Sequence, residues 1–303
     1  TYRHTDHLTR RTELNLPAVP LGEDQHGRPL FGQLRQLGST LAAEPGTNRR
    51  FAGFDAVQGL EVTGFSEFYA ATAGIERVAE QGLSVGLHYT FSRTTDNLNG
   101  SAGSVASAFP GGLAGEDWRE GTADTDAPHR LLAAVEWGTR PFRLGAVYRL
   151  RSGTPYTAGF RAGVDANGDG IAGNDPAFVD PNLPGMQALL AEHDCLGDVV
   201  GGFAERNACR GDLVGRLDVR ATVALGRMRG APLALVLDAV DVLATETGPI
   251  DAALYLVDRT GTLVTDPGTG ITTVPLRANP NFGGVLADRS PGPLFRVGLR
   301  IGR

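Results

Sequence analysis

The chain has 303 residues, of which 41% are hydrophobic and 20% are charged, so its length and composition fit either soluble domains or a membrane wall of strands. Its formal net charge of -6 excludes nucleic acid as a partner, because nucleic-acid-binding proteins generally carry a basic field. The most apolar window, residues 233–244, is shorter than the about 20 residues of a spanning helix and contains Asp238 and Asp241, which excludes a helical membrane protein.

The chain starts at Thr1 without the basic and apolar stretches of a signal peptide, so we expect it to be a piece of a longer protein. From this start, we expect a series of antiparallel β-strands. In chain order they are residues 1–13, 65–79, 83–95, 128–138, 141–153, 213–225, 231–243 and 293–303.

Alternation of apolar and polar residues is the main evidence for these strands. In the strand at 83–95, one face comprises Leu83, Val85, Leu87, Tyr89 and Phe91. The same division recurs in the strands at 141–153, 213–225 and 293–303, where arginines occupy the other face. Each strand is about ten residues long or longer, close to the 9–11 residues that cross a bilayer at a tilt.

Connection lengths alternate between short and long. The short ones are 80–82, 138–140 and 226–230, and the long ones are 98–126, 157–212 and 244–291. Outer-membrane barrels have short periplasmic turns and long extracellular loops. The sequence therefore predicts an all-β fold in which an antiparallel transmembrane β-barrel wall carries long extracellular loops, notably 157–212 and 244–291. Residues 51–63 are expected to extend a strand above the membrane, and 254–265 to form a hairpin around 259–261.

A serine-hydrolase pattern, G-x-S-x-G, occurs at residues 82–86. That chemistry requires a sharp strand-to-helix turn that presents the serine. Ser84 lies inside an alternating strand instead, so we expect the protein not to be an enzyme.

The polar faces of the later strands are rich in arginine. We expect these residues to face the barrel lumen, because a charge at mid-membrane on the lipid face costs about 2–4 kcal/mol. The predicted lumen-lining residues are Arg143, Arg149, Arg151, Arg216, Asp218, Arg220, Arg296 and Arg300. Two interpretations remain: a substrate path, or a solvated lining whose charges pair with one another.

An Asp-rich segment follows at residues 165–170. Its D-x-N-x-D-G spacing directs oxygen atoms of Asp165, Asn167 and Asp169 at one calcium ion, but the twelfth position is Pro176 instead of a bidentate glutamate. A structural calcium and a metal-free turn rich in Asp and Asn are both compatible with this pattern. No cofactor is expected to be required.

Cys195 and Cys209, the two cysteines of the chain, lie in one Gly/Asp-rich stretch. They fit a single loop-closing disulfide in an oxidising compartment, or two free thiols in a cytosolic protein.

Several motifs, in order, resemble the barrel of Oar-like TonB-dependent transporters. They include the run at 69–97, Asp126-Ala127-Pro128-His129-Arg130, Ser152-Gly153-Thr154-Pro155-Tyr156-Thr157, the Asp-rich segment at 165–170 and Asn281-Phe282-Gly283. The resemblance covers nearly the whole chain. One departure is Arg303, where family members usually end in an aromatic residue that the barrel-assembly machinery recognises.

This resemblance implies a 22-stranded barrel with an N-terminal plug. Residues 1–303 would be the C-terminal part of that barrel, about eight membrane strands without the plug. The implied function is energy-coupled uptake of a scarce solute or peptide across the outer membrane of a Gram-negative cell. The implied partners are the TonB system, acting through the plug, the barrel-assembly machinery and outer-membrane lipid, with the transported substrate unspecified.

Two other functions remain as alternatives. One is a small closed outer-membrane barrel with a structural or adhesive role, since eight strands can close into a barrel. The other is a secreted, β-rich calcium-binding module.

Overall fold

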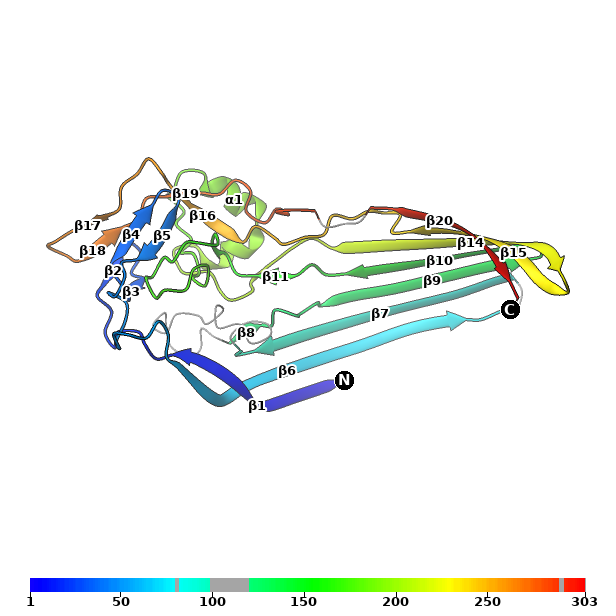
Figure 1. Ribbon diagram of the computed structural model, residues 1–303, viewed down its shortest axis with the longest axis horizontal. Coiled ribbons are helices and arrows are strands. Elements are labelled where there is room, and N and C mark those ends of the chain that lie inside the picture. The colour runs from blue at the N-terminus through cyan, green and yellow to red at the C-terminus, as the bar shows by residue number, and fades with distance from the viewer. Residues whose placement is uncertain (80–81, 99–119, 289–291, 303) are drawn as a thin grey trace.

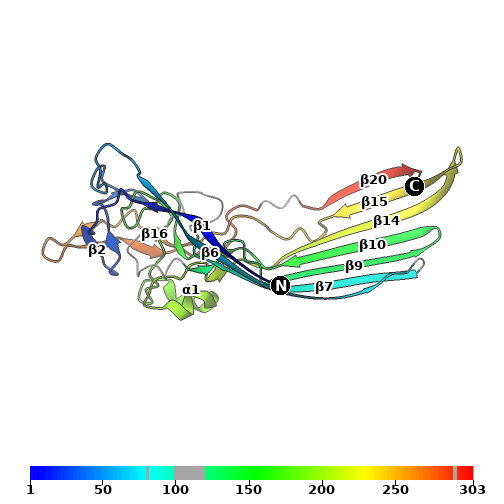
Figure 2. The ribbon, with the colours of Figure 1, turned by 90° about the horizontal axis from the view of Figure 1, so that it is seen from below.

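The computed structural model describes residues 1–79, 82–98, 120–288 and 292–302. A long curved sheet makes up one end of the molecule, and a compact cap of short strands and helices makes up the other (Figures 1 and 2). Among the helices of these residues, none has the length and hydrophobicity to cross a membrane.

The long sheet is an antiparallel meander. Its strands, in order across the sheet, are β1 (Tyr2–Glu13), β6 (Gln58–Arg77), β7 (Gly82–Asp96), β9 (His129–Thr139), β10 (Phe142–Arg151), β14 (Val214–Met228), β15 (Ala231–Val240) and β20 (Leu294–Ile301). A short strand, β8 (Gly121–Thr122), pairs with the cap end of β7. Every expected membrane strand is therefore present and pairs with its neighbour in sequence, so the all-β, antiparallel prediction is confirmed.

The strand ends differ in detail from the prediction. β14 continues to Met228, so its turn to β15 consists of Arg229 and Gly230, whose φ angles of 51° and 83° suit a tight hairpin. The turn between β9 and β10 is at residues 140–141. β6 is one strand of 20 residues, so residues 58–63 do extend a membrane strand toward the cap. Residues 80–81 of the first predicted turn and 99–119 of the first long connection lie outside the described residues.

The sheet is open. In the described part of the chain β1 and β20 are its two edges, and neither pairs with the other. This arrangement differs from a small eight-stranded barrel, in which the first and last strands would meet.

Three connections of the sheet fold into the cap: residues 14–57, which were not among the predicted long loops, and the two connections that contain the predicted loops 157–212 and 244–291. They contribute β2 to β5 before β6, β11, β12, α1, η4 and β13 between β10 and β14, and β16 to β19 before β20. The bounds are β2 (Gly22–Asp24), β3 (Pro29–Leu30), β4 (Leu34–Leu37), β5 (Thr40–Ala43), β11 (Pro155–Tyr156), β12 (Gly159–Phe160), α1 (Met186–Glu192), η4 (Asp194–Val199), β13 (Cys209–Arg210), β16 (Ala253–Val257), β17 (Val264–Thr265), β18 (Ile271–Thr273) and β19 (Leu276–Ala278).

One hydrophobic core joins these segments. Leu41, Val164 and Tyr255 each come from a different connection, and each is at most 2% exposed. β12 pairs with β16, and β2 pairs with β18, which ties distant parts of the sequence together. The connections predicted as separate long loops are therefore one folded unit.

The prediction of a hairpin around residues 259–261 was wrong. β16, which ends just before these residues, pairs with β12 and β19, and the hairpin joins β17 to β18 instead. The Asp266 carboxylate accepts a hydrogen bond from the Gly268 amide at 2.8 Å, and Gly270 has a φ of 74°. The turn of this hairpin is therefore at the Asp-Pro-Gly segment, between β17 and β18.

Candidate functional site

One face of the long sheet is an uncovered apolar surface. Leu83, Trp137 and Leu144 stand opposite one another on adjacent strands, and the same row continues through Ala221, Leu237 and Val297. Leu83, Val85 and Leu87 are 42%, 38% and 45% exposed, so no second layer of protein packs on them. An apolar patch that crosses this many strands suits contact with lipid, because soluble proteins rarely expose such a surface.

Aromatic side chains lie near both ends of this apolar face. At the cap end, the Tyr89 hydroxyl is 2.6 Å from Nδ1 of His129, and the Phe91 and His129 rings are 5.7 Å apart. At the turn end, Trp137 and Phe142 are exposed. Amphipathic rings favour the boundary between lipid and water, so these residues fit the two edges of a membrane-embedded band.

The opposite face is polar. Immediately beside the apolar row, Ser84, Glu136 and Gly145 stand opposite one another, followed by Arg220, Asp238 and Arg296. The strand register places all the predicted lumen residues on this same face: Arg143, Arg149, Arg151, Arg216, Asp218, Arg220, Arg296 and Arg300. The structure thus brings them together, and their role in a lumen stays a prediction.

Several of these side chains form ion pairs. Nη1 of Arg149 and Nε of Arg216 are 2.7 and 3.1 Å from the two carboxylate oxygens of Asp218. Arg220 pairs with Asp238 at 2.6 Å. The arginine side chains are about half exposed or more, so solvent screens these pairs and they contribute little to stability. Sequence reasoning missed Asp238 as a partner, although alternation along the very apolar β15 places it on the polar face.

A hollow of about 850 Å³ lies against this polar face. Its floor contains Gly86, Ala134 and Gly145, whose small or absent side chains leave the space open. Arg149 and Arg216 are among its other lining residues. We call this space the inner-wall hollow.

The Asp-rich segment is buried in the cap. Asp165, Asn167 and Asp169 are 4%, 1% and 2% exposed. The amide of Asp169 donates to Oδ1 of Asp165 at 3.1 Å, and the amide of Gly170 donates to its Oδ2 at 2.9 Å. Gly168 has a φ of 71°, and a Cβ there would lie 2.9 Å from the backbone of Gly32, so this turn requires glycine.

Burial changes the acidity of this segment. The pKa of Asp165 is raised to about 6, chiefly by burial and in addition by the nearby charge of Asp169. Burial also raises the pKa of Asp175 to about 8, although Arg28, 3.5 Å away, lowers it. For Asp175, loss of water therefore outweighs the ion pair with Arg28.

The donor set of the Asp-rich segment consists of oxygen atoms, which suits calcium. However, Oδ2 of Asp169 already accepts hydrogen bonds from the side-chain amides of Asn167 and Asn174. In the described residues, no group of three or more His, Cys, Asp or Glu side chains is arranged to hold a metal ion. The calcium site therefore stays a prediction.

We expect added calcium to raise the melting temperature of the purified full-length protein only if Asp165 and Asp169 bind it. At a calcium concentration of 100 times Kd, the stabilisation would be about 2.7 kcal/mol. Thermal unfolding with EGTA and then with calcium measures this. Asp165→Asn should abolish the shift, whereas Asp198→Asn, at an exposed cap position, should retain it. Equal melting temperatures with EGTA and calcium would leave the segment as a metal-free turn.

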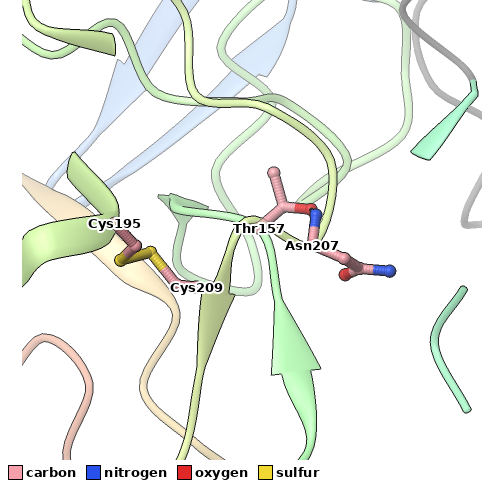
Figure 3. The surroundings of a disulfide bond; sticks show 4 residues. All are labelled: Thr157, Cys195, Asn207 and Cys209. Carbon is pink, nitrogen blue, oxygen red and sulfur yellow. Dashed lines mark hydrogen bonds between the residues drawn. A yellow bond between two sulfur atoms is a disulfide. The ribbon is translucent and has the colours of Figure 1, made fainter. Parts of the chain in front are cut away.

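A disulfide joins Cys195 of η4 to Cys209 of β13 (Figure 3). β13 pairs with β11 through Cys209 and Tyr156. Beside it, the Asn207 amide donates to Oγ1 of Thr157 at 2.8 Å. The bond therefore ties the helical part of the cap to the strands that lead back to the sheet.

Replacing both Cys195 and Cys209 with serine should destabilise the cap by about 3 kcal/mol, because the bond closes a short loop in the unfolded chain. Cap peptides should then exchange amide hydrogens faster in mass-spectrometric measurements, while β7 and β9 peptides should not change. Reduction of the unaltered protein is the control and should reproduce the effect. Unchanged exchange in the cap would show that packing alone holds it.

A family model described as an outer membrane beta barrel domain matches residues 3–192, which is more than half of the chain. Neither a curated protein nor a solved structure matches the chain. The matched segment includes β1 to β10, and β14, β15 and β20 continue the same sheet. The chain therefore belongs to the outer membrane β-barrel domain family and is located in the outer membrane.

Proposed function

We propose that this chain is part of the barrel of a TonB-dependent receptor, which takes up a scarce solute or peptide across the Gram-negative outer membrane. The resemblance of its motifs to Oar-like transporters supports this proposal. The partners are the TonB system, the barrel-assembly machinery and the lipid around the apolar face. Ser84 has no catalytic role in this proposal, because its hydroxyl bonds the backbone of Ala79 within the connection of β6 to β7.

The open sheet is the observation that carries this function. In the described residues, β1 and β20 each have one unpaired edge. Unpaired backbone groups in lipid are costly, so each edge needs pairing partners. A wide barrel of 22 strands supplies them, and it has the interior that a transporter needs.

The cap supports the same function. It stands at the end of the sheet opposite the short turns (Figure 1). In outer-membrane barrels the short turns face the periplasm. The cap is then on the outside of the cell, where a receptor first meets its solute.

The proposal is tested by TonB binding. The full-length protein, purified in detergent, should bind the isolated C-terminal domain of TonB in a pull-down, and an uncoupler of the inner-membrane proton gradient should stop uptake in cells. Absence of TonB binding would contradict the proposal. A full-length porin of similar size serves as the negative control.

The competing small barrel is tested by cross-linking. If β1 met β20, cysteines at Thr5 and Phe295 would come within reach of a short cross-linker in some register of that pair. We expect no such cross-link in the full-length protein. As a positive control, cysteines at Leu144 and Ala221, which stand opposite each other on β10 and β14, should cross-link. A Thr5–Phe295 product would favour the small closed barrel.

A further inference from the structure

The charges around the inner-wall hollow are unequal. Arg149 and Arg216 share one carboxylate, that of Asp218, which also accepts the Asp241 amide at 3.0 Å. With three donors already bound, the Asp218 carboxylate can accept few further hydrogen bonds from these two guanidinium groups. Each guanidinium carries five N–H donors, so most donors on these two side chains remain for another acceptor.

A second arginine pair repeats this imbalance. Nε and Nη2 of Arg220 bond both oxygens of Asp238, at 2.6 and 3.1 Å. Arg296 stands opposite Asp238 on β20, and no carboxylate of the described residues lies within 4 Å of its guanidinium. Together, four arginines surround two aspartates, which leaves two positive charges in excess on this side of the hollow.

The other two acidic residues of the hollow, Glu76 and Glu136, lie apart from these arginines and already have partners. Glu136 pairs with Arg143 at 3.2 Å, and Glu76 is 2.8 Å from Nε2 of His88. These glutamates stand on β9 and β6, whereas the four arginines stand on β10, β14 and β20. The small floor residues of the hollow separate the two sides and leave room for a ligand.

We propose that the inner-wall hollow binds an anionic group, a carboxylate or a phosphate, through Arg149, Arg216, Arg220 and Arg296. Arginine presents its donors in a planar fork that matches both of these anions. The chain as a whole is acidic, with a net charge of -6, so a local excess of positive charge is a specific feature of this wall. The claim that the anion is cargo rests on the proposed uptake function, whereas the binding itself does not.

The anionic group that these arginines would bind has two possible sources. The anionic group belongs either to a passing solute or to an acidic side chain of protein that is seated inside the complete barrel. Both place a carboxylate or a phosphate at the same arginines. The structure of the full-length protein with a bound probe anion distinguishes them.

Sulfate is the probe for binding. Equilibrium dialysis of labelled sulfate against the full-length protein at low ionic strength should show saturable binding. Arg149→Gln and Arg216→Gln together should raise the Kd for sulfate about tenfold or more, because each removes a charge-assisted hydrogen bond. Arg130→Gln is the matched control, since Arg130 shares the polar face but lies outside the hollow, and it should leave the Kd unchanged. An equal loss of sulfate affinity in Arg130→Gln would overturn the site, because it would mean that the whole polar face attracts sulfate without a specific site.

A change of shape tests the hollow without changing charge. Gly145→Leu should fill it and weaken sulfate binding about tenfold, since only one atom lies within 4 Å of a Cβ at that position. Gly298→Leu is the control, because a Cβ there also meets open space on the same face but outside the hollow. A heat-modifiable gel shift checks that each variant folds. Unaltered binding in Gly145→Leu would overturn the location.

Selenate, detected by its anomalous scattering in crystals of the full-length protein, locates the anion. A peak at two or more of the four arginines supports a solute site, and a protein carboxylate at those arginines supports the second source. A peak that persists in Arg149→Gln/Arg216→Gln means an adventitious ion only. The proposal would be overturned if the crystals showed neither a selenate peak nor a protein carboxylate at the four arginines and dialysis showed no sulfate binding. TonB binding is independent of these results, so failure of one proposal is distinguishable from failure of the other.

Discussion

Arginine in place of Val135 should prevent most of the protein from assembling in the membrane, whereas arginine in place of the adjacent Ala134 should be tolerated. Val135 is on the apolar face and is paired with Val85 and Ala146 near the middle of the strands, while Ala134 is on the polar face. A charge at the bilayer midplane costs about 2–4 kcal/mol, which is a large fraction of the stability of a protein. The measurement is the fraction of heat-modifiable protein after refolding into lipid vesicles.

This pair of variants controls for side-chain size and charge, because both add the same residue to the same strand. Urea denaturation in vesicles then gives the difference in free energy of unfolding. If Ala134→Arg were the more damaging variant, the assignment of the apolar face to lipid would be reversed. Equal effects would show that neither face contacts lipid.

At a pH above about 8, where Asp175 is ionised, removal of the buried Arg28 should destabilise the cap by about 3–5 kcal/mol, because it leaves two buried carboxylates without their cation. Arg28 is 1% exposed, and it lies 3.3 Å from Asp24 and 3.5 Å from Asp175. Its guanidinium carbon is also 4.9 Å from the centre of the Phe203 ring. Hydrogen exchange of cap peptides in Arg28→Ala measures the loss.

Lowering the pH should reduce the loss of cap stability in Arg28→Ala. Without Arg28, burial raises the pKa of Asp175 even further, so the folded cap binds a proton more tightly than the unfolded chain does. Stability of the variant therefore increases as the pH falls from about 8 toward 5, measured with EGTA present. Arg259→Ala, at an exposed cap arginine, is the control and should change little. A loss independent of pH would mean that packing around Phe203, and not charge, is the main contribution of Arg28.

The membrane strands could be predicted because their signal is local. A strand that faces lipid on one side and polar groups on the other alternates residue by residue, so Leu83 to Phe91 identifies its own two faces. The same parity is sufficient to place Arg149, Arg216 and Arg220 on one face of the sheet. Only the strand ends differ from the prediction, as at Met228.

The cap could not be predicted because its contacts are not local. Leu41, Val164 and Tyr255 share one core, yet they are far apart in sequence and follow no periodic pattern. β16 pairs with β12 and β19, and no pattern within residues 254–265 indicates either partner strand. The misplaced hairpin and the description of 157–212 and 244–291 as separate loops follow from this.

A shared interior has a mechanical consequence for the cap. Segments that are packed around Leu41, Phe160 and Leu254 cannot swing apart one at a time without exposing that interior to water. Any displacement must therefore move the whole assembly as a rigid body about its attachments to the strands. Under the proposed uptake function, a solute that reaches the cap passes around this body, or enters only when the whole body tilts.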